Sequence, residues 1–416
     1  MGRSSRPLLQ RSMIGISMYR TNGSGKMREQ CRRYRAMRRK FIAVAFGVFL
    51  LHPILSVGRP GRGRYAGTVS TCRSGGDCSK FPAAASDAAL YYGSTTSIIA
   101  LNVETGKPLW TYSLKKGWIA SNVVALGSSV FFASNTAGPC APVYAIGTET
   151  QKIEWSKDYG SCPIWSDGRR LYVQGGNGGG DGIIAVDPAT GKELWHAEGE
   201  TPRFVQTLVV RNGRIYTDDR VLDAKTGKTL LWWPKDSSIS VITATNSVVV
   251  IGGYIGGHNG ILSAYHATTL EKEWQSTLFI GKDIVSAVAA DKMAYVVGYT
   301  GSATSARDGV LQAFNANTGQ TEWSYQIHSC CQNLNASPIS IGQNALYLVE
   351  PADAQSGAKL VALDPVTGKL LWSFQSAAMV QGPAFPQGSR VYVTDPQDKV
   401  IALDAATGRS VWAYQP

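Results

Sequence analysis

Residues 362–372 read Ala362-Leu-Asp364-Pro-Val-Thr367-Gly368-Lys-Leu-Leu-Trp372, and variants of this stretch recur along the chain. The sequence contains eight copies, and all eight have Thr at the sixth position. Each copy closes on a Trp, and these are Trp110, Trp155, Trp195, Trp232, Trp274, Trp323, Trp372 and Trp412. A segment that returns at a regular period indicates a repeat architecture, in which each repeat is one structural unit.

The residues in the middle of each copy are typical of a tight hairpin. The third residue is often Asp, whose carboxylate accepts backbone N–H bonds in a turn. Gly at the seventh position supplies the positive φ that such a turn needs. Two copies carry Gln151 and Leu270 there instead, so these two hairpins are expected to be strained or to use another turn. The fourth copy is slipped by one residue, which leaves Trp232 with Trp233 behind it.

Apolar runs ahead of each motif indicate further strands. Examples are Val391–Val393 and Leu346–Leu348, which are bounded by turn residues. Each repeat therefore predicts four short strands. Such units leave apolar faces that only neighbouring units cover, and successive motif Trp residues lie 37 to 49 residues apart, one blade each. We expect an all-β fold, an eight-bladed β-propeller of four-stranded antiparallel blades over residues 81–416.

The repeat resembles the tryptophan-docking motif of the pyrroloquinoline-quinone-like (PQQ-like) propellers over about residues 81–416. The resemblance implies that each motif Trp packs between adjacent blades. That superfamily contains quinoprotein dehydrogenases, which bind the quinone and Ca²⁺, and non-catalytic propellers such as the outer-membrane assembly lipoprotein of the barrel-assembly machinery. The chain is closer to the non-catalytic members, because it has neither long insertions nor a Cys-x-x-Cys-His cytochrome motif. The repeat alone does not separate the two kinds, since a fold does not specify a function.

The net charge of +12 is concentrated in the leader. Residues 1–64 hold 15 Lys or Arg and one acid, which leaves 26 Lys or Arg against 28 Asp or Glu in residues 65–416. A nucleic-acid partner would need a basic surface on the folded part. The sequence therefore predicts no nucleic-acid binding.

The leader has the features of an export signal. Its basic end runs into the uncharged segment Phe41–Leu51, which is short for a bilayer span, and Ser56 and Gly58 give a small-x-small cleavage pattern. We expect residues 1–58 to form a basic leader and signal peptide, with a linker at 59–80. The protein is then secreted, or periplasmic in the cell envelope, and contacts a membrane only if the leader stays uncleaved.

Strand order separates two ends of the ring. The hairpin face carries the Thr-Gly hairpins and the turns between first and second strands. The loop face carries the connections between second and third strands and the links between blades. Its irregular connections are Asn135–Pro142, Gly175–Gly182, Gly252–Gly260, Tyr299–Gly309, Pro351–Gly357 and the link Ile327–Ala336. Loops on a rigid scaffold commonly carry function, so the loop face is the predicted binding surface.

Six cysteines follow the leader, an even number that is compatible with full pairing in an exported chain. Buried free thiols are the alternative. Cys140 and Cys162 both fall on the loop face and are predicted to pair. Cys72 and Cys78 would close a small loop before the first blade.

The remaining two cysteines, Cys330 and Cys331, are adjacent. They resemble the vicinal disulfide that lies over the cofactor in quinoprotein alcohol dehydrogenases, which makes them candidate cofactor-binding residues. In those enzymes the pair stands in an early blade, whereas this pair precedes the seventh. A structural or separately bridged pair is therefore the alternative.

Few other residues suggest chemistry. The glycine-rich loop Gly175–Gly182 has the wrong Asp register for a calcium repeat and is typical of a flexible hairpin loop. His258 and His328 lie on the loop face without metal-ligand spacing. Asp308 and Glu350 stand in suitable loops for a cation or a base, as many surface acids would. No metal site is predicted.

The sequence thus favours an exported, non-catalytic and monomeric propeller that binds a protein or other extracellular ligand through its loop face. No cofactor is expected under this interpretation. The alternative is a PQQ- and calcium-dependent dehydrogenase of alcohols or aldose sugars, for which the catalytic residues are unknown.

Overall fold

Strands and turns make up all the regular structure of the described residues. The computed structural model describes residues 82–86, 88–135, 142–160, 163–175, 182–198, 205, 207–234, 237–255, 258–277, 283–299, 308–328, 339–350, 358–376, 381–395 and 397–416. All of these residues belong to one compact unit, Phe46–Pro416. No stretch among them forms a helix long and apolar enough to cross a membrane.

Each blade is one antiparallel sheet made from one continuous stretch of chain. Blade 1 contains β1 (Pro82–Ala85), β2 (Ala89–Gly93), β3 (Ser97–Asn102) and β4 (Pro108–Ser113), and blade 2 contains β5 (Trp118–Ile119), β6 (Val124–Leu126), β7 (Ser129–Asn135), β8 (Val143–Gly147) and β9 (Ile153–Lys157). Blade 3 contains β10 (Ile164–Ser166), β11 (Leu171–Gln174), β12 (Ile183–Val186) and β13 (Glu193–Ala197), and blade 4 contains β14 (Leu208–Arg211), β15 (Arg214–Thr217), β16 (Arg220–Asp223) and β17 (Thr229–Trp232).

Blades 5 to 8 follow the same order. Blade 5 contains β18 (Ser238–Ala244), β19 (Val248–Ile255), β20 (His258–His266) and β21 (Lys272–Thr277), and blade 6 contains β22 (Asp283–Ala290), β23 (Met293–Tyr299), β24 (Asp308–Asn315) and β25 (Thr321–His328). Blade 7 contains β26 (Ile339–Ile341), β27 (Leu346–Glu350), β28 (Lys359–Leu363) and β29 (Leu370–Gln375), and blade 8 contains β30 (Gln381–Gln387), β31 (Arg390–Thr394), β32 (Val400–Asp404) and β33 (Ser410–Tyr414). In blade 2 the inner strand is broken into β5 and β6, which both pair with β7.

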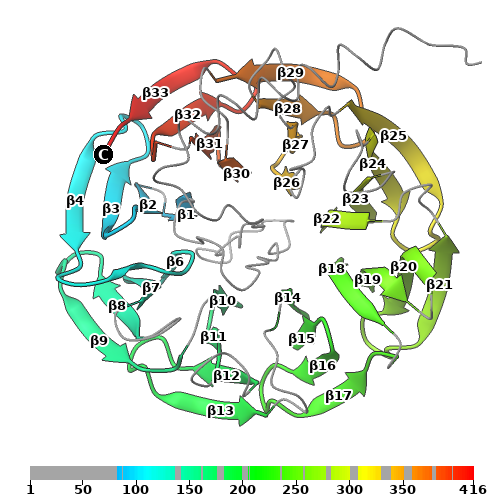
Figure 1. The fold of residues 1–416 in the computed structure, drawn as a ribbon, viewed down its shortest axis with the longest axis horizontal. Helices are drawn as coiled ribbons and strands as arrows, with labels where there is room; N and C mark the ends of the chain where they lie inside the picture. Colours follow the sequence, from blue (N-terminus) through cyan, green and yellow to red (C-terminus); the bar gives the residue numbers. More distant parts are fainter. Residues whose placement is uncertain are drawn as a thin grey trace, which may run out of the picture. The chain divides into compact units, whose positions relative to one another are not determined.

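The eight blades close into a ring, which confirms the predicted all-β, eight-bladed propeller (Figure 1). The fourth strand of every blade lies on the perimeter, and the first strand lies toward the centre (Figure 1). Blade 8 lies beside blade 1, where the Trp412 indole Nε1 donates a hydrogen bond to the Val103 carbonyl at 2.9 Å. Both blades are complete sheets, so the described ends of the ring abut without exchanging strands.

The core is divided among the interfaces between blades. Side chains alternate between the two faces of a strand, and β27 shows the effect. Leu346 and Leu348 pack toward blade 6, in a cluster with Val297, whereas Tyr347 and Val349 pack toward blade 8. Because both faces of the middle strands are buried, their sequences are mostly apolar, and every blade depends on both neighbours for its core.

The hairpin turns follow from the local sequence. Asp364 Oδ1 accepts hydrogen bonds from the Val366 N–H at 2.9 Å, the Thr367 N–H at 2.7 Å and the Thr367 hydroxyl at 2.9 Å. Gly368 then adopts a φ of 69°. At the same position Gln151 and Leu270 have φ values of 56° and 64°, so these residues keep the turn and adopt a left-handed conformation that is unfavourable for a side chain.

Acid is expected to weaken these hairpins. Hydrogen bonds from Thr367 hold the pKa of Asp364 below its usual value, and equivalent Thr residues lower the pKa of Asp223 and Asp404. Because each folded pKa lies below the unfolded one, the ionised carboxylates stabilise the fold above about pH 4. This stabilisation is lost as the pH falls through the lowered values, and urea unfolding midpoints between pH 6 and pH 2 measure the loss.

The control is the triple variant Asp223→Asn, Asp364→Asn and Asp404→Asn. The amide oxygen of Asn still accepts the turn hydrogen bonds, as Asn102 Oδ1 does from the Thr105 N–H at 2.9 Å, but the side chain no longer titrates. The triple variant should therefore lose less stability on acidification. An unchanged pH dependence would show that these carboxylates do not contribute to it.

Candidate binding face

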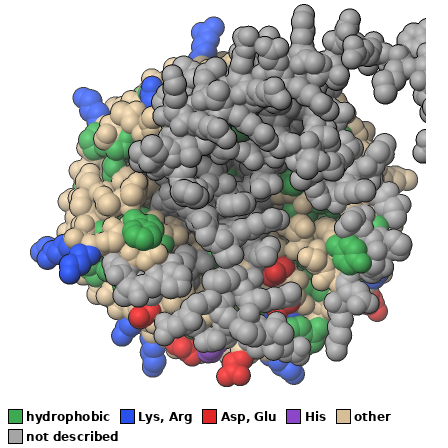
Figure 2. Space-filling view, in the orientation of Figure 1, with side chains coloured by type: hydrophobic (Ala, Val, Ile, Leu, Met, Phe, Trp, Pro, Cys, Tyr) green, Lys and Arg blue, Asp and Glu red, His purple; other side chains and the backbone are tan. Residues whose placement is uncertain are grey.

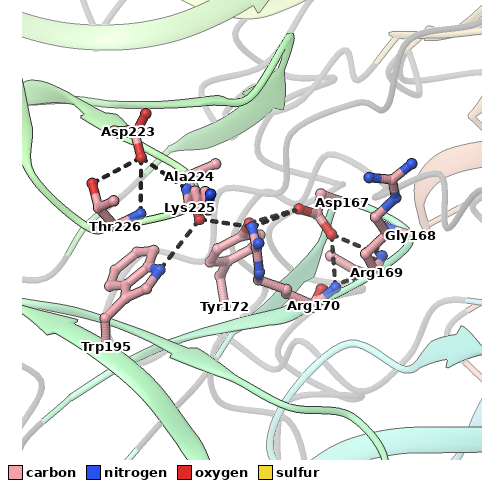
Figure 3. A network of polar contacts seen from close by, with 11 residues as sticks. Asp167, Gly168, Arg169, Arg170, Tyr172, Trp195, Asp223, Ala224, Lys225 and Thr226 are labelled. Carbon is pink, nitrogen blue, oxygen red and sulfur yellow. Dashed lines mark hydrogen bonds and ion pairs between the residues drawn. The ribbon is translucent and has the colours of Figure 1, made fainter.

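The hairpin face is occupied by contacts that join the blades. Between blades 3 and 4, the Trp195 indole Nε1 donates to the Ala224 carbonyl at 3.2 Å, and Arg170 Nη1 donates to the same oxygen at 2.9 Å (Figure 3). Trp195 also packs on the Tyr172 ring, with centroids 6.0 Å apart. On its other side lies Gly227, where a Cβ atom would meet the indole at 2.6 Å. We call this arrangement an indole dock.

Five other motif Trp residues make the same dock on the following blade. The indole donors and carbonyl acceptors are Trp155 to Pro188 (2.9 Å), Trp274 to Ala316 (2.8 Å), Trp323 to Pro365 (3.1 Å), Trp372 to Ala405 (3.0 Å) and Trp412 to Val103 (2.9 Å). Trp110 packs on Tyr91, with ring centroids 5.9 Å apart, without an equivalent bond to the described part of blade 2.

Trp232 differs from the other motif Trp residues, because its side chain is 40% exposed. The Arg220 guanidinium carbon lies 4.9 Å from its ring centroid. Trp233 is the buried residue here, and its indole donates to the Thr217 carbonyl at 2.7 Å and packs on Tyr265 at 5.1 Å. In this copy Leu231 is paired with Val221, the place that Trp195 holds opposite Ala185 in blade 3. Trp232 is the next residue and faces the other side of the strand, so the residue that packs between blades 4 and 5 is Trp233 and not the predicted Trp232.

Much of the predicted loop face lies outside the described residues. This applies to Cys72, Cys78, Cys140, Cys162, Cys330 and Cys331, and to most of the predicted loops. The predicted loop Gly252–Gly260 is an exception and a correction, because Gly252–Ile255 belong to β19 and His258–Gly260 to β20. Glycines let the two strands continue here, since a Cβ on Gly253, with a φ of 150°, would lie 2.8 Å from the Ser240 nitrogen.

Exposed apolar side chains divide by type between the two ends of the ring. Aromatic ones are Trp118 at the start of β5 (51% exposed), Tyr254 near the end of β19 (41%) and Trp232 at the end of β17 (40%), and all three strand ends point to the loop face. The exposed aliphatic residues are in the hairpins or the first two positions of outer strands, and they are Leu109, Ile153, Leu194, Leu230, Val366, Leu370, Leu371 and Val411.

Among the described residues visible in Figure 2, the exposed hydrophobic side chains do not form one continuous surface. They stand there in separate places around the ring, with Lys and Arg side chains projecting from the rim. Trp and Tyr are enriched among the residues that dominate protein interfaces, whereas single exposed aliphatic residues are common on any surface. The aromatic residues on the loop face are therefore the stronger candidates for partner contacts.

Glu350 lies on the loop face at the end of β27, where it is engaged by two neighbours. Its Oε1 accepts a hydrogen bond from the Tyr325 hydroxyl at 2.7 Å, and its Oε2 lies 2.8 Å from Lys359 Nζ. Burial, and then the Glu350 carboxylate, raises the pKa of Tyr325. With both carboxylate oxygens engaged, Glu350 joins blades 6 and 7 and does not fit the role of a free calcium ligand.

The backbone brings two other predicted residues together. Asp308 and His328 are paired across β24 and β25 at the loop-face end of blade 6. The structure describes only the backbone of these two residues and of His258, and not their side chains. Within the described residues, no group of three or more His, Cys, Asp or Glu side chains is arranged to hold a metal ion.

Trp118 and Tyr254 are candidate contact residues that motif analysis missed, because both lie outside the repeat. A weak signal was present, since the chain has 11 Trp and the eight copies use only eight of them. The other two extra residues, Trp165 and Trp233, are buried at 1% and 5% exposure. Composition alone therefore does not separate a surface indole from a core one.

These features define an eight-bladed propeller whose blades are joined by indole docks on one face. The family model described as outer membrane protein assembly factor BamB matches residues 94–231, 141–255, 220–379 and 332–416. These overlapping matches span nearly every blade, and the chain belongs to this family of PQQ-like propellers.

Curated relatives include quinoprotein ethanol dehydrogenases. That of Pseudomonas aeruginosa is 28% identical over 214 residues, 42% of this chain and 33% of the relative. That of Pseudomonas putida is 27% identical over 205 residues, 40% of this chain and 32% of the relative. The matched region thus spans about a third of the length of these relatives.

Solved structures show the same fold at low sequence identity. Apo AztD from Citrobacter koseri aligns over 79% of this chain and 94% of its own, with 13% identity and a TM-score of 0.54. The computationally designed Ika8 protein aligns over 72% of this chain and 87% of its own, with 12% identity and a TM-score of 0.55. At such identities the likeness concerns the fold alone.

Proposed function

We propose that this chain is an exported, non-catalytic propeller that acts as a binding or scaffold module, holding a protein partner or other extracellular ligand on its loop face. The observation that carries the proposal is the position of Trp118, Tyr254 and Trp232 at loop-face strand ends, since these are the exposed aromatic side chains among the described residues. The description of the matched family as an assembly factor is consistent with a scaffold role.

Two features support binding on the loop face rather than on the hairpin face. The hairpin face uses its turn carbonyls and glycines to dock indoles, so its geometry is constrained by the packing of the ring. Loops and strand ends on the other face have no such constraint and can vary with a partner. The basic leader and the segment Phe41–Leu51 support export to the periplasm, envelope or medium, and the predicted pair Cys140–Cys162 fits that compartment.

The double variant Trp118→Ala and Tyr254→Ala tests the proposal. The full chain is produced with its own leader, crosslinked in cells, and the crosslinked proteins are quantified by mass spectrometry. Removing two interface aromatics typically costs 2 kcal/mol or more, so specific crosslinks should fall at least about ten-fold. The urea unfolding midpoint should stay unchanged, because both side chains are exposed.

The matched control is the double variant Leu109→Ala and Leu194→Ala, which removes side chains that are 50% and 47% exposed from the hairpin side of the rim. This control should keep the crosslinks of the unmodified chain. Equal losses in both variants, or no loss in either, would contradict a partner site on the loop face.

The second candidate is a PQQ- and calcium-dependent dehydrogenase of alcohols or aldose sugars, which the similarity to quinoprotein ethanol dehydrogenases favours. The predicted pair Cys330–Cys331 would then lie over the quinone. Purified chain is mixed with PQQ and Ca²⁺, then assayed with ethanol and glucose and an artificial electron acceptor. A binding module gives no dye reduction and no thermal shift, whereas reduction that needs both additives would overturn the non-catalytic proposal.

A further inference from the structure

Five arginines among the described residues are buried or half-buried, and three of them contact a carboxylate. These pairs, with the distance from guanidinium nitrogen to carboxylate oxygen, are Arg170 with Asp167 (3.8 Å), Arg220 with Asp219 (3.9 Å) and Arg390 with Glu104 (3.1 Å). The other two, Arg211 and Arg214, contact no carboxylate in the described part of the chain. No acid in contact therefore balances their positive charges.

Arg211 and Arg214 stand opposite each other at the hairpin-face end of blade 4. They are register partners across β14 and β15 and flank a two-residue turn. Directly opposed residues have Cβ atoms about 5 Å apart, with side chains on the same face of the sheet. Both side chains reach blade 5, where Arg211 Nη2 donates to Asn246 Oδ1 at 2.7 Å and Arg214 Nη1 donates to the Ala267 carbonyl at 2.6 Å. Two like charges thus converge where blades 4 and 5 meet.

The equivalent turn of blade 3 shows how the fold balances such an arginine. Asp167 and Arg170 flank a two-residue turn there, and Arg170 reaches the hairpin of the next blade as Arg214 does (Figure 3). Asp167 thus holds in blade 3 the place that Arg211 holds in blade 4. Like charges directly opposite each other destabilise a strand pair, whereas opposite charges stabilise it. Packing of the ring therefore favours an acid at this place, and blade 4 has a second arginine.

The protein contacts leave most of the guanidinium donors of this pair unused. Each guanidinium group has five N–H donors. Arg211 uses one of them, on Nη2, and its buried Nε has no hydrogen-bond partner. Burial lowers the pKa of Arg211, as expected for a charge that has lost water without gaining a counter-ion. Arg214 uses two, which donate to the carbonyls of Ala267 and Thr268.

The surroundings of the pair are basic. The hairpin of blade 4 packs against this turn through a backbone hydrogen bond of 2.8 Å, and it carries the exposed Lys225 and Lys228. Asp223 is in register with Arg214 across β16, but its Oδ1 accepts hydrogen bonds from the Thr226 N–H and hydroxyl, both at 2.8 Å. This concentration of positive charge lies on a folded part in which acids outnumber bases, so it favours an anionic ligand.

We propose that Arg211 and Arg214 form a site that binds a phosphate group, either as inorganic phosphate or as the headgroup of an anionic phospholipid. Two converging guanidinium forks suit a phosphate, which has several acceptor oxygens and up to two charges, better than a carboxylate, which is matched by one fork. The site lies at the hairpin-face end of blades 4 and 5. It is therefore separate from the loop face and does not depend on the proposed function.

Titration calorimetry of the full chain with sodium phosphate tests this site. Arg211→Asp gives blade 4 the acid that blade 3 has at this place, so it should pair with Arg214 and weaken phosphate binding about ten-fold or more. Its urea unfolding midpoint in chloride should not fall, since a like-charge pair becomes an opposite-charge pair. Arg211→Gln, whose amide still donates to Asn246, should weaken binding in the same direction. The control Arg409→Gln removes an exposed cation from the hairpin of blade 8 and should leave binding unchanged.

Cosedimentation with phosphatidylcholine vesicles, with and without phosphatidylglycerol, distinguishes the two sources of the phosphate group. Binding of inorganic phosphate that is lost in Arg211→Asp and kept in Arg409→Gln assigns the site to free phosphate. Binding only to the vesicles that contain phosphatidylglycerol, with the same pattern in the two variants, assigns it to a lipid headgroup. The proposal is wrong if the unmodified chain binds neither, or if Arg211→Asp and Arg409→Gln change binding equally.

Discussion

Replacing Gly227 by Ala is expected to lower the free energy of unfolding by about 2 to 5 kcal/mol. Part of the loss, about 1 to 2 kcal/mol, comes from the φ of 74°, which is unfavourable for any residue with a Cβ. The remainder comes from the new methyl group, which would lie 2.6 Å from the Trp195 ring and displace it from its dock. Urea unfolding followed by Trp fluorescence measures the change.

Two control substitutions separate these effects. Gly388 has a φ of 57°, but a Cβ there meets nothing within 4 Å, so Gly388→Ala should lose only the backbone contribution. Gln151 already has a Cβ at the same hairpin position with a φ of 56°, so Gln151→Ala should change stability by less than about 0.5 kcal/mol. A loss from Gly388→Ala as large as that from Gly227→Ala would contradict the role given to the indole contact.

The second large effect is expected for Trp412→Ala, which removes the dock that closes the ring. The indole packs on Tyr392, with centroids 5.7 Å apart, and donates to Val103 in the first blade. Removing a packed aromatic residue of this kind costs about 3 to 5 kcal/mol. The unfolding midpoint in urea should fall accordingly, and Trp412→Phe should lose about 1 kcal/mol, the contribution of the N–H donor.

Trp232→Ala is the control, because Trp232 closes its copy of the motif in the sequence but lies one residue past the docking place, which Leu231 holds. It makes no dock, is 40% exposed and has one ring face against Arg220. Its removal should lose only the cation–π contact, about 0.5 to 1 kcal/mol. Equal losses from Trp232→Ala and Trp412→Ala would mean that stability depends on the residue type in the motif and not on docking.

The number of blades and the form of each hairpin could be predicted because they depend on residues close together in the chain. Asp364 and Thr367 are three residues apart, and their hydrogen bonds form within one turn. Even the two exceptions, Gln151 and Leu270, keep the same turn, because the remaining turn residues and the flanking strands hold the backbone in place. A repeat of such local units already implies a ring.

The candidate binding residues were harder to predict because exposure depends on distant neighbours. Trp165 and Trp118 both lie outside the repeat, yet one is 1% exposed and the other 51%. Glu350 was a plausible cation ligand from its place in the sequence, and only the folded chain brings Tyr325 and Lys359 to its two oxygens. The sequence positions of these residues contain no information on such contacts.

The sequence by itself determined the eightfold repeat, the four-stranded blade and the turn at each hairpin, since these follow from strand periodicity and from bonds within a few residues. Only the tertiary structure decided that Trp233 rather than Trp232 is buried and that six of the motif indoles dock on the following blade. The physical reason is that a docked indole belongs to one blade and its carbonyl to the next, and that Trp233 packs on Tyr265 of the next blade, so both outcomes depend on how two blades pack.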